Sequence, residues 1–163
     1  MKRKLFTLLA LASLLGAGEL KITSQKFTAD ENTGISIFTG KVNIIKNTDE
    51  LNASKVTVYT DKKNQPIKFV AVGNVSFNIL TETQAKYRGK SQEAIYYPKI
   101  KEYHFFKDVH LQQMDNKKEI IGDEVILKTV EGTAYAKGLE KQPVIMIFDI
   151  ADVNETNTTK AVK

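Results

Sequence analysis

Apolar and polar residues alternate along most of this chain, and the alternation predicts β-strands. In the middle of the chain, apolar side chains occupy every second position at Val75, Phe77 and Ile79, and again at Val109 and Leu111. A period of two places one side of a strand in an apolar interior and the other side in water. The pattern predicts about a dozen short strands joined by polar turns, and therefore an all-β sandwich, roll or barrel.

A short motif recurs three times and divides the strands into pairs. Its copies are Gly40-Lys41-Val42, Gly73-Asn74-Val75 and Lys107-Asp108-Val109, and a second strand follows each copy. A period of about 33 residues indicates one supersecondary unit that buries its apolar face only by stacking on its neighbours. The repeated unit is predicted to be a pair of antiparallel strands.

The predicted strand within residues 144–150 is the most continuously apolar run that follows the N-terminal segment. Such a strand is either buried on both faces or exposed at a sheet edge, where it can pair with another chain. As an edge, it would join protomers end to end through a strand near residue 20, and the assembly would grow as a rod. The residues of this expected oligomer edge are Leu20, Ile22, Val144, Ile145 and Ile147.

The N-terminal segment has the order of a secretory signal peptide. Basic residues precede an apolar run at 5–15 that ends in small residues, and this run is shorter than the roughly 20 residues of a spanning helix. We expect residues 1–18 to be cleaved, residues 19–150 to form one folded domain, and residues 151–163 to form a disordered polar tail. An uncleaved membrane anchor is the alternative. The chain has no cysteine, which excludes a lipid anchor and disulfides.

The charge of the chain argues against a nucleic-acid partner. The formal net charge is +5, and it falls to +2 when Lys2, Arg3 and Lys4 of the expected signal peptide are subtracted. The remaining basic residues are scattered among acids, which is typical of a mixed solvated surface rather than a phosphate-binding stripe.

The sequence contains no recognisable catalytic constellation. It has no cysteine nucleophile, no Gly-x-Ser-x-Gly turn and no glycine-rich phosphate loop, so we expect neither an enzyme nor a bound cofactor. His104 and His110 flank Asp108, but their spacing fits no closed zinc site, and both fall on the polar side of a strand. The acidic pairs Asp49-Glu50 and Asp123-Glu124 are assigned to turns or strand starts. No catalytic or metal-binding residue is predicted.

Large apolar residues at strand positions are the candidate functional surface. They would either fill a core, as every β-sandwich requires, or line an open apolar groove that holds lipid. The residue pattern leaves both interpretations open. The set is Val42, Ile44, Val56, Val58, Phe69, Val75, Phe77, Ile79, Tyr96, Phe105, Val109, Leu111, Val125 and Leu127.

Five segments resemble successive strands of the OstA-like family of lipopolysaccharide-transport proteins. They lie at 36–42, 53–59, 71–77, 87–97 and 122–127, and the resemblance extends over residues 20–138. It implies a twisted, open β-jellyroll in the periplasm whose interior carries the acyl chains of lipid A. It also implies a head-to-tail homo-oligomer that bridges an LptC-like inner-membrane protein and an LptD-like outer-membrane protein. A membrane-tethered LptC-like protein, or a structural β-scaffold with a filled core, is the alternative.

The C-terminal segment contains a candidate glycosylation site. Residues 152–156 read Asp-Val-Asn-Glu-Thr, which places Asn154 in a sequon with an acid two residues earlier. Residues 50–54 fit the same pattern around Asn52, but they lie where a strand is expected. If the host has a suitable oligosaccharyltransferase, Asn154 is expected to be modified first because a disordered tail is accessible.

Overall fold

The computed structural model describes residues 19–150 and shows an all-β chain, with no helix in that range. The expected signal peptide, C-terminal tail and Asn154 lie outside the described residues. The chain forms one antiparallel sheet in the order β1-β3-β4-β5-β6-β7-β8-β10, in which β2 also pairs with β3 and β9 with β8. The strands are β1 (Leu20–Thr23), β2 (Lys26–Asp30), β3 (Ile35–Lys46), β4 (Asp49–Thr60), β5 (Pro66–Leu80), β6 (Lys86–Tyr97), β7 (Glu102–Gln113), β8 (Lys118–Lys128), β9 (Thr133–Lys137) and β10 (Ile145–Ile147).

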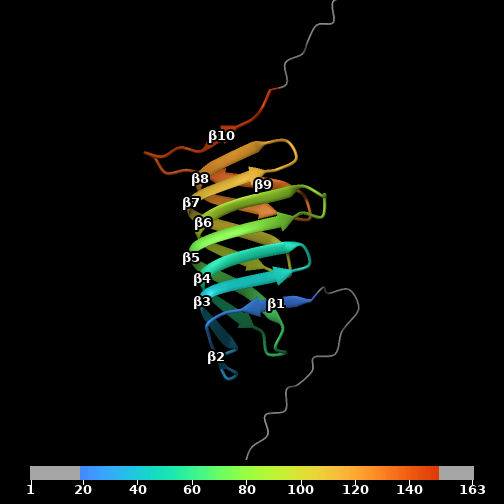
Figure 1. Cartoon of the computed structure of the whole chain (residues 1–163), viewed down its shortest axis with the longest axis vertical. Helices are drawn as coiled ribbons and strands as arrows, with labels where there is room; N and C mark the ends of the chain where they lie inside the picture. The colour runs from blue at the N-terminus through green and yellow to red at the C-terminus, as the bar shows by residue number, and fades with distance from the viewer. Residues whose placement is uncertain (1–18, 151–163) are drawn as a thin grey trace, which may run out of the picture.

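The strands stack in chain order, so β1 and β2 lie at one end of the molecule and β10 lies at the other (Figure 1). In the described chain, β1 pairs only with β3 and β10 only with β8, so the sheet is open. The expectation of about a dozen short strands is wrong in one respect. The strands β3 to β8 are 11 to 15 residues long, because each bends without ending.

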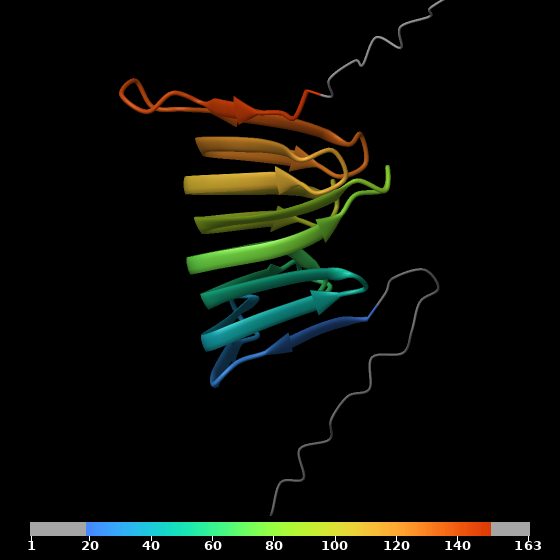
Figure 2. The ribbon, with the colours of Figure 1, turned by 45° about the horizontal axis from the view of Figure 1, so that its top comes forward.

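The bends fold the single sheet into two facing layers, a β-jellyroll (Figure 2). The front layer consists of β1, residues 42–46, 49–53, 75–80, 86–91, 109–113 and 118–122, and β10. The rear layer consists of β2, residues 35–39, 55–60, 66–72, 93–97, 102–106 and 124–128, and β9. The two layers are continuous with each other at the bends. The opposite edge, where the turns that connect the strands lie, is called the mouth.

The recurring sequence motif is the bend itself. In β3, β5 and β7 the register shifts between Thr39 and Val42, between Val72 and Val75, and between Phe106 and Val109. Each shift contains two consecutive residues with positive φ: Gly40 and Lys41, Gly73 and Asn74, and Lys107 and Asp108. An extra residue in left-handed conformation is the geometry of a β-bulge, which bends and twists a strand. The motif is therefore a bulge in the middle of a strand rather than the start of one.

The buried core fills the space between the layers. Register aligns interior residues into rows across the strands, such as Ile44, Leu51, Phe77, Gly89 and Leu111 in the front layer. A facing row in the rear layer contains Phe38, Val56, Ala71, Ala94, Phe105 and Val125. These rows run along the stack, perpendicular to the strands. The interior is therefore an apolar tunnel-shaped region that follows the long axis of the molecule.

The two terminal strands are exposed edges. All three residues of β10 are exposed, and Leu20 in β1 is 39% exposed. The alternative that residues 144–148 form a central strand covered on both faces is wrong, since β10 has one neighbour among the described strands. Its apolar residues lie at the end of the stack, where no further strand of the described chain covers them.

Candidate functional site

The predicted apolar residues all lie in the interior of the roll. Every one of them belongs to the buried core except Ile44 and Tyr96, which are partly buried and pack against it. Val56, Phe105, Val109, Val125 and Leu127 are 0% exposed. The structure therefore brings the whole predicted set together on one continuous surface, with contributions from β3 to β8.

The middle of this interior is filled by aromatic rings. Phe77 and Phe105 stack with ring centroids 4.0 Å apart, and the Tyr103 ring lies parallel to Phe105 at 6.0 Å. The absence of a side chain at Gly89 makes room for this stack, because a Cβ there would lie 2.5 Å from Cζ of Phe77. We call Phe77 and Phe105 the aromatic wall. A groove that stays open along its whole length is therefore absent from the described chain.

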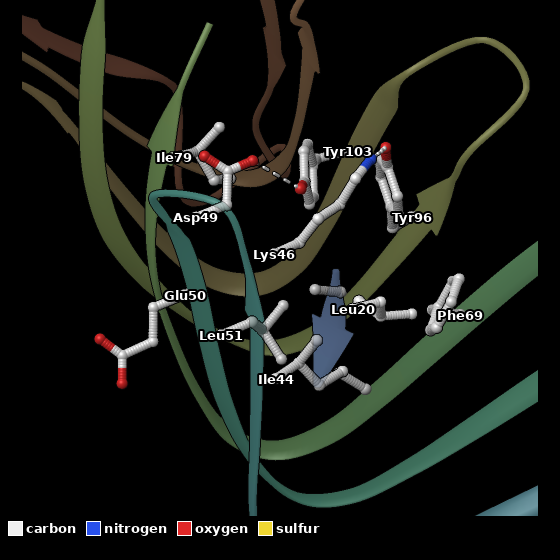
Figure 3. A pocket seen from close by; sticks show the side chains of 12 residues that line it. Leu20, Ile44, Lys46, Asp49, Glu50, Leu51, Phe69, Ile79, Tyr96 and Tyr103 are labelled. Atoms are coloured by element: carbon white, nitrogen blue, oxygen red, sulfur yellow. Dashed lines mark hydrogen bonds between the residues drawn. The ribbon is translucent and has the colours of Figure 1, made fainter. Parts of the chain in front are cut away.

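A cavity lies on the N-terminal side of the aromatic wall. The space in it that a water-sized molecule can occupy is only about 40 Å³, it is partly open to solvent, and its surface is almost entirely apolar. Figure 3 shows the Leu20 side chain of β1 between Ile44 and Leu51 on one side and Phe69 on the other, with Ile79 farther away, whereas Glu50 points away.

Polar side chains surround the outer part of this cavity. Asp49 accepts a hydrogen bond from the Leu80 N–H at 2.8 Å and another from the Tyr103 hydroxyl at 3.3 Å (Figure 3). Lys46 donates to the Tyr96 hydroxyl at 3.3 Å. Burial raises the pKa of the Asp49 carboxyl above its ordinary value and outweighs the two hydrogen bonds, which lower it. Burial also raises the pKa of Tyr103 well above its ordinary value, assisted by the nearby Asp49 charge.

A second cavity lies on the C-terminal side of the aromatic wall. It has a volume of about 170 Å³, and its lining includes Tyr87, Leu111, Ile120, Ala134 and Met146. Met146 belongs to β10 and Leu20 to β1, so each terminal strand covers one of the two cavities.

The mouth is held shut near its centre by contacts between the two layers. The Glu82 N–H donates to the Thr129 carbonyl at 3.0 Å, and the Lys101 ammonium pairs with the Glu82 carboxylate. The Thr129 hydroxyl donates to the Lys101 carbonyl at 2.8 Å. Glu82 follows a front-layer strand, whereas Lys101 and Thr129 lie in rear-layer turns, so these contacts join the two layers.

The histidines and acidic pairs occupy structural positions. His104 contacts the Glu102 carboxylate at 3.2 Å, and His110 contacts Glu119 at 2.8 Å. Within residues 19–150, no three His, Cys, Asp or Glu side chains are arranged to hold a metal ion. The same range has no helix long and apolar enough to cross a membrane. The assignment of Asp123-Glu124 to a turn or strand start is wrong, because both residues lie inside β8 at its bend.

Sequence reasoning missed seven residues that line the N-terminal cavity: the small Ala71 and Ala94, the outward-pointing Glu50, and four larger residues, Lys46, Asp49, Leu51 and Tyr103. The alternation contained a signal for three of the four larger residues, since Lys46 follows Ile44 by two positions, Leu51 follows Asp49 by two, and Tyr103 precedes Phe105 by two. Asp49 was interpreted as a turn residue. It does begin β4, but it turns inward because Tyr103 and Leu80 supply hydrogen-bond donors there.

Comparisons with known proteins agree with this architecture. Residues 21–133 match the family described as LptA/(LptD N-terminal domain) LPS transport protein. The fold is similar to the crystal structure of LptH from Pseudomonas aeruginosa, described as the LptA homologous periplasmic component of the lipopolysaccharide transport device. The TM-score is 0.72 at 12% identity, over 82% of this chain and 96% of that one. No curated protein matches the chain significantly. Because the family match spans most of the described residues, the chain belongs to the LptA/LptD N-terminal family, whose members are non-enzymatic lipopolysaccharide-transport proteins of OstA-like β-jellyroll fold.

Proposed function

We propose that this protein carries lipopolysaccharide across the periplasm and shields the lipid A acyl chains between its two layers. The observation that supports this most is the apolar N-terminal cavity, which is open to solvent and has a polar rim of Lys46, Asp49, Tyr96 and Tyr103. An apolar interior with a polar rim suits an amphipathic molecule, whose chains enter while its saccharide stays in water.

Apolar burial supplies enough free energy for such a carrier. Each buried CH₂ group contributes about 0.8 kcal/mol, so one long acyl chain gains on the order of 10 kcal/mol. The two end cavities, of about 40 and 170 Å³, are separated by the aromatic wall and are narrow as the structure stands. Chains that pass from one cavity to the other must therefore displace the Phe77 and Phe105 rings, and the layers must part to admit several chains together.

The same proposal includes assembly and partners. Copies of the chain join head to tail by pairing β10 of one protomer with the β1 end of the next, and the rod connects an LptC-like inner-membrane protein to an LptD-like outer-membrane protein. The exposed backbone edges and apolar side chains of β1 and β10 support this arrangement. Export to the periplasm would use residues 1–18 as a cleaved signal peptide.

Photocrosslinking from single positions tests the lipid-binding part of the proposal. A photoreactive residue at Phe77, which is 2% exposed and interior, should crosslink to lipopolysaccharide. The matched control is Val72 of the same strand, which is 44% exposed on the outer face of the rear layer and should remain unlabelled. Equal labelling at both positions would reject an interior lipid site.

A structural scaffold with a filled core is the second candidate, and the aromatic wall favours it. This candidate predicts a folded protein in which neither Phe77 nor Val72 is labelled. The same pair of variants therefore separates the two functions.

A further inference from the structure

The outer faces of the two layers differ in chemistry. On the rear layer, one outward register row is largely aliphatic and consists of Ile37, Thr57, Val70, Ile95, His104 and Ile126. The cations Lys107 and Lys128 are paired with Glu93 and Glu102. The middle of the front layer carries only polar residues on its outer face. The two faces therefore present different surfaces to solvent.

A polar hollow lies on the outer face of the front layer, over β5, β6 and β7. Its polar side chains form two register rows, Ser76-Lys90-His110 and Asn78-Arg88-Gln112, and its floor is formed by Gly89 and Phe77. Neighbouring strands lie about 4.8 Å apart. All six side chains carry hydrogen-bonding groups and none of the six is a carboxylate, while Glu50 on β4 and Glu119 on β8 flank the second row on either side.

The two cations of the hollow are available to a ligand. Arg88 and Lys90 are exposed, and neither has a carboxylate within ion-pair distance among residues 19–150. They project from the same face of β6, two positions apart, so their charges repel and an anion placed between them would relieve the repulsion.

Neighbouring contacts hold the rest of the hollow in place. Arg88 uses only its Nε to bond Asn78, at 3.1 Å, which leaves the terminal nitrogens of the guanidinium free. Glu119 binds His110 at 2.8 Å and Gln112 at 3.2 Å, and so fixes both side chains at the border of the hollow.

We propose that this hollow binds an anionic saccharide, with Arg88 and Lys90 on a phosphate or carboxylate and with Ser76, Asn78 and Gln112 on hydroxyl groups. A guanidinium and an ammonium form strong charge-assisted bonds with such anions, and amides and hydroxyls complement sugar hydroxyls. Where the saccharide belongs to a lipid that the protein carries, the inference rests on the proposed function. The row Asn78-Arg88-Gln112 runs alongside the front-layer turns of the mouth, one or two residues from the strand ends, where the saccharide of a lipid held inside would emerge.

Titration of the full folded chain with glucose monophosphate tests the proposal, with amide chemical shifts as the readout. We expect shifts at residues 76–78, 88–90 and 110–112, and weaker binding of glucose and of inorganic phosphate. Arg88→Ala/Lys90→Ala should weaken binding by about tenfold or more, because charge-assisted bonds to both cations are lost. Binding should also weaken as salt concentration rises.

The matched control is Lys26→Ala/Lys55→Ala. It removes the same two charges from the outer face of the rear layer, where these lysines lie in one register row across Thr39. Binding should be unchanged in this variant. Equal loss in both double variants, or the absence of shifts around the hollow, would overturn the proposal.

A second experiment, photocrosslinking to lipopolysaccharide, tests whether the saccharide belongs to a lipid. It compares labelling at the hollow with labelling in the interior. A photoreactive residue at Gln112 should crosslink to lipopolysaccharide, and Arg88→Ala/Lys90→Ala should reduce this labelling while that at Phe69, which lines the N-terminal cavity and not the hollow, persists. Labelling at neither position, together with retained glucose monophosphate binding, would reject the lipid-carrier function and assign the hollow to free anionic saccharides. Labelling at Phe69 without saccharide binding would reject the hollow alone.

Discussion

At the scale of single residues, Asp49 is a carboxyl group held against the apolar interior. Burial raises its pKa above the ordinary value of 3.8. Its folded form therefore binds a proton more tightly than the unfolded chain does. The stabilising contribution is fully present below the ordinary pKa, and it is lost as pH rises through the raised pKa.

Asp49→Asn removes this titration while its amide oxygen can still accept from Leu80. We expect the free energy of unfolding of the variant, relative to the unaltered protein, to increase as the pH rises from below 3.8 to neutral. Urea unfolding at a series of pH values measures this. Asp61→Asn is the control of opposite sign, because the backbone N–H groups of Gln65 and Lys63 lower the pKa of Asp61. Identical pH profiles for Asp49→Asn and the unaltered protein would show that burial does not control this carboxyl group.

Phe105 is the centre of the aromatic wall, so its removal should join the two cavities. Phe105→Ala should lower the free energy of unfolding by about 3–5 kcal/mol, the usual cost of truncating a buried phenylalanine. It should also increase the amount of a fluorescent fatty-acid probe bound per folded chain. Phe106→Ala, on the outer face of the same strand, is the control and should leave probe binding unchanged. Unchanged binding in Phe105→Ala would show that the wall does not limit access.

At the scale of elements, the bulges determine the fold. A non-glycine residue in left-handed conformation costs roughly 1–2 kcal/mol. Lys107, at φ 62°, stands in the third repeat where Gly40 and Gly73 stand in the first two. The third bend is therefore more strained than the others.

Lys107→Gly should stabilise the protein by up to about 1 kcal/mol, because relief of strain exceeds the added entropy of the unfolded chain. The ion pair lost with Glu93 is exposed and contributes little. Lys55→Gly, which lies in β4 without a positive φ, should instead destabilise by roughly 0.5–1 kcal/mol. Chemical denaturation of both variants measures the difference, and loss of stability in Lys107→Gly would contradict the strain argument.

The sequence predicted the strands and the interior residues well because a period of two is a local property. It identified the repeat but not its meaning, since Gly40-Lys41 and Gly73-Asn74 also resemble ordinary turn sequences. The aromatic wall could not be predicted, because it depends on which rows of the front and rear layers face each other. Phe77 and Phe105 are 28 positions apart, and only the folded bends bring their rings together.

At the scale of the whole molecule, we expect the open ends to control the proposed head-to-tail assembly. Ile145 lies in β10, where its backbone pairs with Ile121 of β8, and its side chain is 50% exposed. Ile145→Lys should leave the monomer folded and abolish concentration-dependent growth in light scattering, because charge blocks strand addition at an edge. Val72→Lys, on an inner strand, is the control and should assemble normally. Loss of the folded monomer in Ile145→Lys would show that β10 stabilises the core instead.

The regular recurrence of the bend also makes the protein a molecular ruler. Each repeat adds two strands, or about 9.6 Å along the stack, without changing the width of the roll. A tandem copy of residues 73–106 would therefore lengthen the molecule by one fixed step, and small-angle X-ray scattering would detect that increment. The length of the molecule and the volume of its interior would then increase in fixed steps with the number of repeats. Duplication of a repeat within the gene would therefore be enough to lengthen the protein.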